Sequence, residues 1–269
     1  MKKFHLLLYV VPMAMAISCK KDATNNLLVP DEDKIDYASY RVIKSILHTA
    51  GTTDTTHYVY TGNNQSYILK SARDPARTVT THFLKHSNYY SFETYSNSVV
   101  TTTGYCRLNN MGYIDSVANL RSNNTFNNID RYTYNEQGYN VTAIINYISY
   151  QQHYTKYYKD NNYSYWINNY TNVANPASNK RDSIVFEYYT DKPQHNFYKT
   201  HLPQLYGKPT KNLVKKRTYY NAAKIAYMTW EYLYDTNEIG LVTKEVFSIY
   251  THPGAVLNKS DTTYFTYNK

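Results

Sequence analysis

The sequence predicts an all-β protein built as one large antiparallel meander. Tyrosine dominates its aromatic residues, with 34 Tyr against 8 Phe and 2 Trp, and tyrosine and threonine favour strands. Alternating segments recur along the chain between turns rich in Asn, Asp and Gly, which is typical of hairpins. No stretch carries the apolar pattern of a long, capped amphipathic helix.

The clearest element is a β-hairpin over residues 131–144. Tyr132 and Tyr134 are two positions apart, so in a strand they point to the same face. Residues 135–138 form a polar turn that ends in Gly138, and glycine adopts a positive φ easily. The residues after the turn are rich in β-branched side chains, which suit a pleated surface.

Two further stretches repeat this hairpin. In the first, Asn109 and Gly112 have the same spacing as Asn135 and Gly138. In the second, residues 232–243, we expect the loop before Gly240 to be two residues longer. Three copies of one hairpin unit predict a meander built by repetition.

The remaining strands follow from the same alternation. We expect one domain over residues 37–269 with about fourteen strands, because no linker divides the chain. The strand-like segments, three of which overlap the hairpins above, are residues 40–48, 56–61, 66–72, 78–85, 89–95, 99–103, 105–108, 143–150, 153–159, 164–170, 182–190, 215–220, 226–234, 242–250 and 260–267.

Residues 191–212 break the pattern. Pro193, Pro203, Pro209 and Gly207 interrupt this stretch, and no alternation is sustained in it. We expect a long loop with one helical turn at residues 202–206. Long loops inside compact domains are often functional or covering elements.

The first 18 residues predict a signal peptide. Lys2 and Lys3 precede an apolar run over residues 4–17, which is too short to span a bilayer as a helix. Residues 16–19 (Ala-Ile-Ser-Cys) resemble the end of a bacterial lipoprotein signal, which implies that Cys19 is lipidated. Two or more acyl chains anchor a protein stably, and residues 19–36 are then the lipidated cysteine and a polar tether.

The lipoprotein resemblance implies a protein of the cell envelope, anchored to the outer membrane and facing the periplasm or the cell surface. Lys20 follows the lipidated position, which does not favour retention in the inner membrane. With Cys19 lipidated, Cys106 cannot form an internal disulfide. Its neighbours are strand-like and include no histidine, so we expect a small strand residue rather than a reactive thiol.

A second resemblance comes from the tyrosine-rich segments. Residues 132–138 (Tyr-Thr-Tyr-Asn-Glu-Gln-Gly) look like the Tyr-Asp repeats of Rhs-type proteins. Residues 186–188, 205–214 and 230–234 look closer to an uncharacterised family of Bacteroidetes lipoproteins, a domain of unknown function with a porin-like fold. The similarity covers roughly residues 37–267. It implies a sheet curled into an open or partly closed barrel, and it implies no activity.

The chain itself argues against a barrel that spans a membrane. Such strands need an outward apolar band about 25 Å tall, whereas both faces of the predicted strands carry Asn, Thr and Tyr. The sequence ends in Tyr267, Asn268 and Lys269 rather than in the terminal aromatic residue usual in such barrels. We therefore expect attachment through the N-terminal lipid.

The sequence contains no familiar catalytic or metal-binding pattern. It has no nucleotide-binding glycine loop, zinc helix, calcium loop or Gly-x-Ser-x-Gly nucleophile elbow. On a strand, His82 and His86 would be about 13 Å apart, too far for one metal ion. Glu93 and Glu187 are isolated strand carboxylates. The sequence thus predicts no enzyme activity, no cofactor and no metal site.

The formal net charge of +9 is spread thinly. Only residues 208–217 form a short basic cluster, which is typical of a solvated surface. We expect no nucleic-acid partner.

The aromatic residues give the strongest indication of function. Tyrosine combines an apolar ring with a polar tip, so a cluster of such rings can form a platform for sugars. The same residues fit cross-strand pairs that only stabilise the sheet, by roughly 0.2–1 kcal/mol each. The predicted platform residues are Tyr150, Tyr157, Tyr165, Trp166 and Tyr170.

The sequence therefore predicts a non-enzymatic binding or assembly module for a glycan or glycoconjugate. The alternative is a carrier of an apolar ligand in a half-barrel groove. That alternative requires a concave face lined by Ile, Leu, Val and Phe.

Overall fold

The computed structural model describes residues 41–49, 52–61, 64–71, 78–121, 126–147, 149–172, 174–195 and 205–268. All of them belong to one compact unit, Asp36–Lys269. The predicted signal peptide, Cys19 and all of the predicted tether lie outside the described residues.

Antiparallel strands make up almost all of the described chain, together with one short 3-10 helix at Pro176–Ser178. The strands are β1 (Arg41–Thr49), β2 (Thr52–Thr61), β3 (Asn64–Ser71), β4 (Thr78–Lys85), β5 (Tyr89–Ser96), β6 (Val99–Leu108), β7 (Ile114–Arg121), β8 (Phe126–Tyr134), β9 (Asn140–Asn146), β10 (Tyr150–Lys159), β11 (Asn162–Asn172), β12 (Lys180–Pro193), β13 (Asn212–Tyr220), β14 (Ala226–Thr236), β15 (Val242–Thr251) and β16 (Val256–Asn268).

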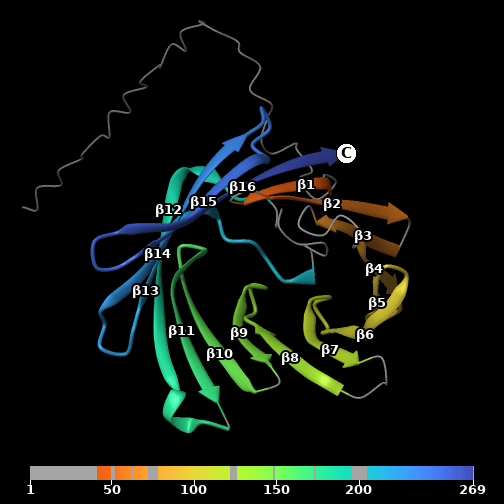
Figure 1. Ribbon diagram of the computed structural model, residues 1–269, viewed down its shortest axis with the longest axis horizontal. Helices are drawn as coiled ribbons and strands as arrows, with labels where there is room; N and C mark the ends of the chain where they lie inside the picture. Colours follow the sequence, from red (N-terminus) through yellow and green to blue (C-terminus); the bar gives the residue numbers. More distant parts are fainter. Residues whose placement is uncertain are drawn as a thin grey trace, which may run out of the picture. The chain divides into compact units, whose positions relative to one another are not determined.

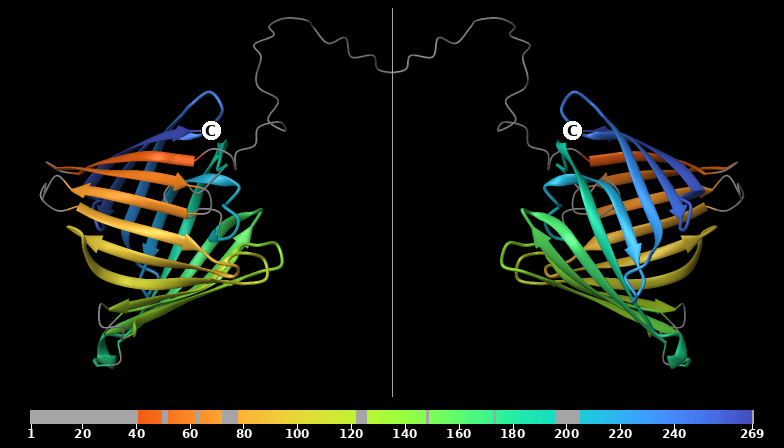
Figure 2. Two further views of the ribbon diagram at one scale, coloured as in Figure 1. Left: turned by 90° about the vertical axis from the view of Figure 1, so that its right-hand side faces the viewer. Right: turned by 90° about the vertical axis from the view of Figure 1, so that its left-hand side faces the viewer.

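The strands form a single meander that curls into a barrel (Figure 1). Each strand pairs antiparallel with its neighbours in the chain, and β1 pairs with β16, with Arg41 opposite Asn268. The register at this seam shifts between Val42 and Lys44. Figure 2 shows the strands running obliquely around the wall. The predicted all-β meander curled into a barrel is confirmed, and the pairing of its first and last strands closes the ring.

One turn type recurs in four hairpins. In each, a leading Asn accepts, through its side-chain oxygen, a hydrogen bond of 2.9–3.0 Å from the backbone N–H four residues later. The residue before that N–H has a positive φ, which glycine adopts without strain. The leading residues are Asn109, Asn135, Asn221 and Asn237.

Two features of these turns differ from the sequence prediction. Asn237 rather than Asp235 leads the turn at Gly240, so that loop has the same length as the others and the expected two-residue extension is wrong. The strands on either side of Asn221 were predicted, but their turn was not recognised as a copy of this unit, because Lys224, with φ 60°, takes the place of the glycine.

Strand β6 runs unbroken through Gly104, where two separate strands were expected. A Cβ atom at this position would lie 2.2 Å from the carbonyl oxygen of Ala118 and 2.4 Å from Cζ of Phe92. The glycine therefore permits a close approach inside the barrel and does not interrupt the strand.

Other boundaries shift by a few residues. β8 begins at Phe126, before the predicted hairpin strand, and the strand predicted at 143–150 ends at Asn146. β12 continues to Pro193, which is opposite Asn212 of β13. The long connection predicted for residues 191–212 is therefore residues 194–211. Of its predicted helical turn, the structure describes only Leu205 and Tyr206.

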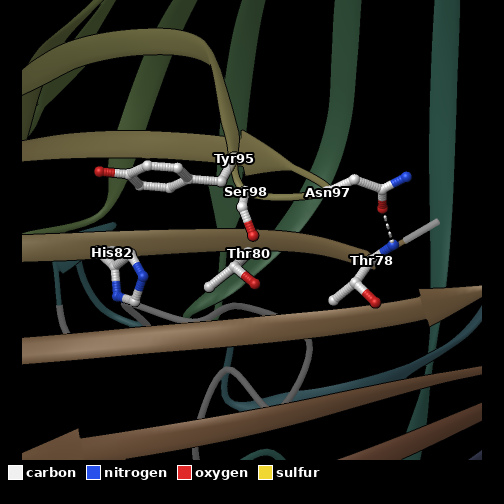
Figure 3. Close-up of a pocket in the computed structure, with 6 residues that line it drawn as sticks. All are labelled: Thr78, Thr80, His82, Tyr95, Asn97 and Ser98. Carbon is white, nitrogen blue, oxygen red and sulfur yellow. Dashed lines mark hydrogen bonds between the residues drawn. The ribbon is translucent and has the colours of Figure 1, made fainter.

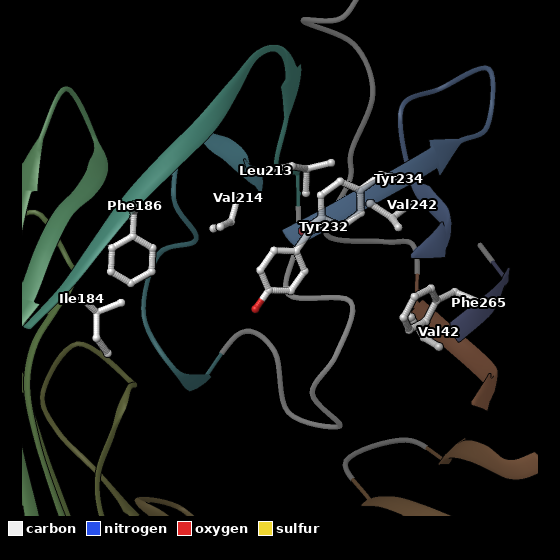
Figure 4. Close-up of a cluster of buried hydrophobic side chains, with 9 residues drawn as sticks. All are labelled: Val42, Ile184, Phe186, Leu213, Val214, Tyr232, Tyr234, Val242 and Phe265. Atoms are coloured by element: carbon white, nitrogen blue, oxygen red, sulfur yellow. The ribbon is translucent and has the colours of Figure 1, made fainter. Parts of the chain in front are cut away.

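Inward side chains form two buried clusters. One, which we name the Leu205 cluster, consists of Phe83, Tyr90, Phe92, Cys106, Ile114 and Leu205. The other occupies β1 and β12–β16 (Figure 4) and consists of Val42, Ile184, Phe186, Leu213, Val214, Tyr232, Tyr234, Val242 and Phe265.

Cys106 is a buried member of β6, as expected for a small strand residue. Burial raises the pKa of its thiol to about 12, so the group is protonated and unreactive at neutral pH.

The outward face carries charged and polar pairs between neighbouring strands. Ion pairs join Arg107 to Asp115 at 2.8 Å and Lys216 to Glu187 at 3.6 Å. Leu233, on the same face of β14 as Glu231, is 63% exposed. Apolar and charged side chains thus alternate around the outer wall. Among the described residues, no helix is both long and apolar enough to cross a membrane.

Candidate functional site

The predicted platform residues lie on two neighbouring strands, with Tyr150 and Tyr157 on β10 and the others on β11. The pairing register places Tyr157 opposite Tyr165, and Lys156 opposite Trp166. Since successive strand residues face opposite sides of a sheet, Tyr165 and Trp166 point in opposite directions. The predicted platform is therefore divided between the two faces of the wall.

Two of its members form a pair on the outside of the barrel. The rings of Tyr157 and Tyr165 stack with centroids 4.2 Å apart and an angle of 13°. They are 39% and 38% exposed, and the neighbouring Val185 is 42% exposed. Because the two rings cover each other's faces, this pair has the geometry of a cross-strand contact in the sheet.

Tyr150 and Tyr170 lie on the same face as Trp166, towards one end of the strand pair. Their ring centroids are 4.8 Å apart, and Tyr147 stacks on Tyr150 at 4.2 Å. Tyr147 is 46% exposed. These three rings form a stack that leads from the turn between β9 and β10 towards the barrel interior.

Trp166 is at the centre of the inward group. Its ring lies 4.9 Å from Tyr163 and 4.8 Å from Phe186, and Tyr154 meets it edge-on at 6.1 Å. The residue packs against the larger buried cluster but stays partly exposed. An inward indole that keeps solvent contact indicates that the interior is not completely filled at this point.

Arg217 of β13 is the residue that sequence reasoning missed. It was interpreted as part of a basic surface cluster, and that interpretation is wrong. Its guanidinium group lies 5.5 Å from the ring of Phe186, 5.2 Å from Tyr232 and 5.9 Å from Trp230. The sequence offered one signal, which is that Arg217 is two positions from Tyr219, so both side chains lie on the same face of a strand. In the structure, Arg217 is opposite Trp230 of β14.

Lys156 of β10 brings a second cation to the same place. Its ammonium group lies 4.8 Å from the ring of Trp166, and that of Arg217 lies 5.9 Å from the same ring. Lys156 donates a hydrogen bond to Oδ1 of Asn140, a buried amide. Burial, reinforced by the charge of Arg217, lowers the pKa of Lys156 to about 8. We name the group of Lys156, Trp166, Phe186, Arg217, Trp230 and Tyr232 the aromatic interior.

Three hydrogen-bond donors in the aromatic interior are buried without an acceptor. They are Nε1 of Trp166, Nε1 of Trp230 and Nε of Arg217. Buried donors in folded proteins nearly always have a partner, and leaving one unpaired costs about 1–3 kcal/mol. This concentration of unpaired donors marks the aromatic interior as the best candidate site in the described chain.

Residues 205–211, which we name the inner segment, close the other side of the barrel interior. Leu205 packs into the Leu205 cluster, and Tyr206 meets Tyr132 of β8 edge-on at 6.1 Å. The N–H of Lys208 donates to the carbonyl of Gly138, and that of Lys211 donates to the carbonyl of Asn161. The inner segment is thus held by two hairpin turns.

Gly207 shows why the inner segment needs its Gly-Lys-Pro sequence. Its φ is +87°, and a Cβ atom would lie 2.6 Å from the carbonyl oxygen of Gly138 and 2.8 Å from the ring of Tyr134. The hairpin of residues 131–144 therefore does more than build the sheet, because its turn receives this segment.

A hollow of about 770 Å³ lies on the outward side of β4 and β5 (Figure 3). Its lining is polar and includes Thr80, His82 and Tyr95. The rings of His82 and Tyr95 meet edge-on at 5.6 Å, whereas His86 stacks on Tyr89 at 4.1 Å. Within the described ranges, no three His, Cys, Asp or Glu side chains come together as metal ligands.

The barrel resembles two solved structures. A porin-like protein from Bacteroides uniformis superimposes with a TM-score of 0.60 at 11% identity, over 84% of this chain and 96% of that one. A porin-like protein from Bacteroides vulgatus gives a TM-score of 0.55 at 10% identity, over 85% and 98% of the two chains. No protein-family model and no curated protein matches the sequence. These likenesses show the porin-like fold, in agreement with the fold that the sequence resemblance implied.

Proposed function

We propose that this chain is a non-enzymatic binding protein of the bacterial envelope whose barrel interior holds a glycan or glycoconjugate. The observation that carries this proposal is Trp166, an inward indole that is partly exposed and surrounded by Tyr154 and Tyr163. The C–H face of a sugar ring is apolar and packs on aromatic rings, while its hydroxyls need polar partners. Ligand sites commonly combine an apolar aromatic lining with a few polar groups.

The inner wall supports this function better than the outer pair does. Tyr157 and Tyr165 stack on each other, so each ring hides one face from a ligand. Trp166 and Tyr170 belong instead to the concave side of the sheet, where a ligand loses more of its contact with water.

The aromatic interior also favours a glycan over an apolar ligand. A carrier of apolar ligands needs an apolar lining, whereas this wall presents the charged groups of Lys156 and Arg217. Transfer of an apolar ligand to such a wall leaves both cations without water, which is costly. On the opposite side, Leu205 already occupies the apolar part of the interior.

A polysaccharide panel with two neighbouring variants tests the proposal. We expect Trp166→Ala to weaken binding at least about tenfold, since such a loss corresponds to about 1.4 kcal/mol. Tyr165→Ala, one residue away on the outer face, should bind as the native protein does. Loss of binding in Tyr165→Ala alone, or no binding to any glycan, contradicts the proposal. Trp166→Phe keeps an aromatic ring at this position. Circular dichroism of both Trp166 variants shows whether weaker binding comes from the lost contact with the sugar or from a loss of folded structure.

The envelope location is a proposal that rests on the sequence around Cys19, outside the described residues. The charged pairs on the outer wall favour attachment through a lipid over a membrane-spanning barrel, because a charge facing lipid at mid-membrane costs about 2–4 kcal/mol. Replacement Cys19→Ala should abolish incorporation of labelled palmitate and release the protein from the membrane fraction. Cys106→Ala is the matched control and should stay anchored. A Cys19→Ala protein that still fractionates with membranes argues against a lipid anchor.

A further inference from the structure

We propose that Lys156 and Arg217 form an anion-binding site inside the barrel that receives a carboxylate or sulfate group of an acidic glycan. The inference deepens the proposed function and rests on it for the identity of the ligand. The geometry of the two cations, the lack of an ion pair to either of them among the described residues, and the unpaired donors support it independently.

The two cations are brought together by four consecutive strands. Lys156 of β10 is opposite Trp166 of β11, and Phe186 of β12 is opposite Arg217 of β13. Both cationic groups consequently lie over one indole ring, at 4.8 Å and 5.9 Å from its centroid. Both residues keep a part of their surface exposed, although Nε of Arg217 is buried.

Within the described part of the chain, neither Lys156 nor Arg217 forms an ion pair with a carboxylate. The buried carboxylate of Glu245 interacts instead with Tyr232, one of the rings beside Arg217. The hydrogen-bond partner of Lys156 is the neutral side-chain amide of Asn140. The rings of Phe186, Trp230 and Tyr232 surround Arg217, and aromatic rings attract a cation without cancelling its charge. Two like charges in a low-dielectric interior repel each other, and a bound anion would remove that repulsion.

The unpaired atoms of the site are nearly all donors of the kind that an anion accepts. Nε of Arg217 and the indole N–H groups of Trp166 and Trp230 are buried and have no acceptor. Carboxylate and sulfate oxygens offer several lone pairs, and hydrogen bonds to charged acceptors are roughly twice as strong as neutral ones. A neutral sugar hydroxyl satisfies fewer of these donors, so the site favours an acidic sugar.

Fluorescence reports on this site directly, because the chain has only 2 Trp residues and both belong to the aromatic interior. The probes are sodium sulfate, an oligogalacturonate and a neutral malto-oligosaccharide, at ionic strength held constant with chloride. We expect a saturable change in emission with sulfate and with oligogalacturonate. Oligogalacturonate should bind at least about tenfold more tightly than the neutral sugar.

The decisive variant is Arg217→Met, with Lys216→Met as its control. Lys216 is the adjacent residue, faces outward and pairs with Glu187, so its removal should leave the titration unchanged. Arg217→Met and Lys156→Met should each weaken oligogalacturonate binding at least about tenfold. Arg217→Lys keeps the charge and should retain sulfate binding, which guards against a folding defect in Arg217→Met.

The outcomes separate the two proposals. Native affinity of Arg217→Met for oligogalacturonate, or no saturable response to either anionic probe, overturns the anion site. Equal binding of neutral and acidic sugars overturns the anion site and leaves the glycan function standing. Binding of sulfate that depends on Arg217, with no glycan bound, supports the anion site and overturns the glycan function.

Discussion

The two sides of the barrel interior use their inward residues in opposite ways. Around β4–β7, Ile114 has no exposed surface and the inner segment supplies Leu205 to complete the packing. Around β10–β14, Trp166 and Arg217 stay partly exposed, and buried donors have no partners. The first arrangement lowers the free energy of the folded chain, whereas the second leaves buried polar groups without a partner, which costs free energy.

This difference explains why the barrel needs its long connection. A barrel of many strands encloses more space than its own inward side chains fill. Leu205 and Tyr206 pack against the inner face around β4–β8. Among the described residues, the buried donors without an acceptor are concentrated in the aromatic interior instead.

The largest contrast is expected between Ile114→Ala and Arg217→Met. Ile114 is completely buried, so its truncation should lower the free energy of unfolding by about 2–5 kcal/mol. Arg217→Met replaces a cation that forms no ion pair within the described part of the chain by an apolar chain of similar length, which is often neutral or stabilising. Urea denaturation of both variants measures the difference. Equal destabilisation would mean that the two sides are packed alike.

Gly207→Ala tests whether the inner segment is held as described. The position combines φ +87° with a backbone oxygen 2.6 Å from the new Cβ atom, so we expect a loss of about 2 kcal/mol or more. Gly112→Ala is the control, because φ is +78° there but no atom lies within 4 Å of the Cβ position. Its cost should be about 1–2 kcal/mol, from the backbone conformation alone. Thermal unfolding that ranks Gly112→Ala as the more damaging variant contradicts this account.

The sequence predicted the sheet well and the interior poorly. Alternation and the Asn-to-Gly spacing located the hairpin of residues 131–144 and its copy at Gly112, because a turn is decided by a few adjacent residues. β4, predicted at residues 78–85, is confirmed at both ends. Gly104 was misinterpreted because its cause, the close approach of Phe92 and Ala118, depends on neighbouring strands.

The candidate site shows the same limit. Alternation alone places Tyr165 and Trp166 on opposite faces, so the division of the predicted platform could have been predicted. The identity of the inward face could not, because both faces of β11 carry aromatic residues. Arg217 was assigned to the surface for a related reason. A run of basic residues usually marks a surface, and only the folded barrel shows which residue of the run points inward.

The titration of Lys156 gives the aromatic interior a pH signature of its own, a stability that increases with pH. Its pKa is about 8 in the folded protein and about 10.4 in an unfolded chain. Between these values the unfolded chain binds more protons, so the free energy of unfolding should rise with pH, by up to about 1.4 kcal/mol per unit. The groups that face it are Arg217 and the phenols of Tyr158 and Tyr163.

Denaturation midpoints between about pH 7.5 and pH 8.5 measure this rise, because the tyrosines of the unfolded chain ionise around pH 10 and begin to oppose it at higher pH. Above that range the trend should reverse, because burial raises the pKa of Tyr158 and Tyr163 in the folded state. Lys156→Met should flatten the rise. Lys216→Met, which removes an outward lysine, should preserve it, and a rise that survives Lys156→Met assigns the effect to another group.

The smallest effect is expected on the outer wall, where Tyr157 and Tyr165 stack in the open. Cross-strand aromatic pairs contribute roughly 0.2–1 kcal/mol, so Tyr157→Ala should lower the free energy of unfolding by no more than that. Tyr165→Ala should cost about the same, and the double variant should cost less than the two losses added, because each single variant already removes the stack. Ligand binding should be unaffected in all three. Full additivity in a double-mutant cycle would show that the two rings do not interact, and the outer half of the predicted platform would then have neither a structural nor a binding role.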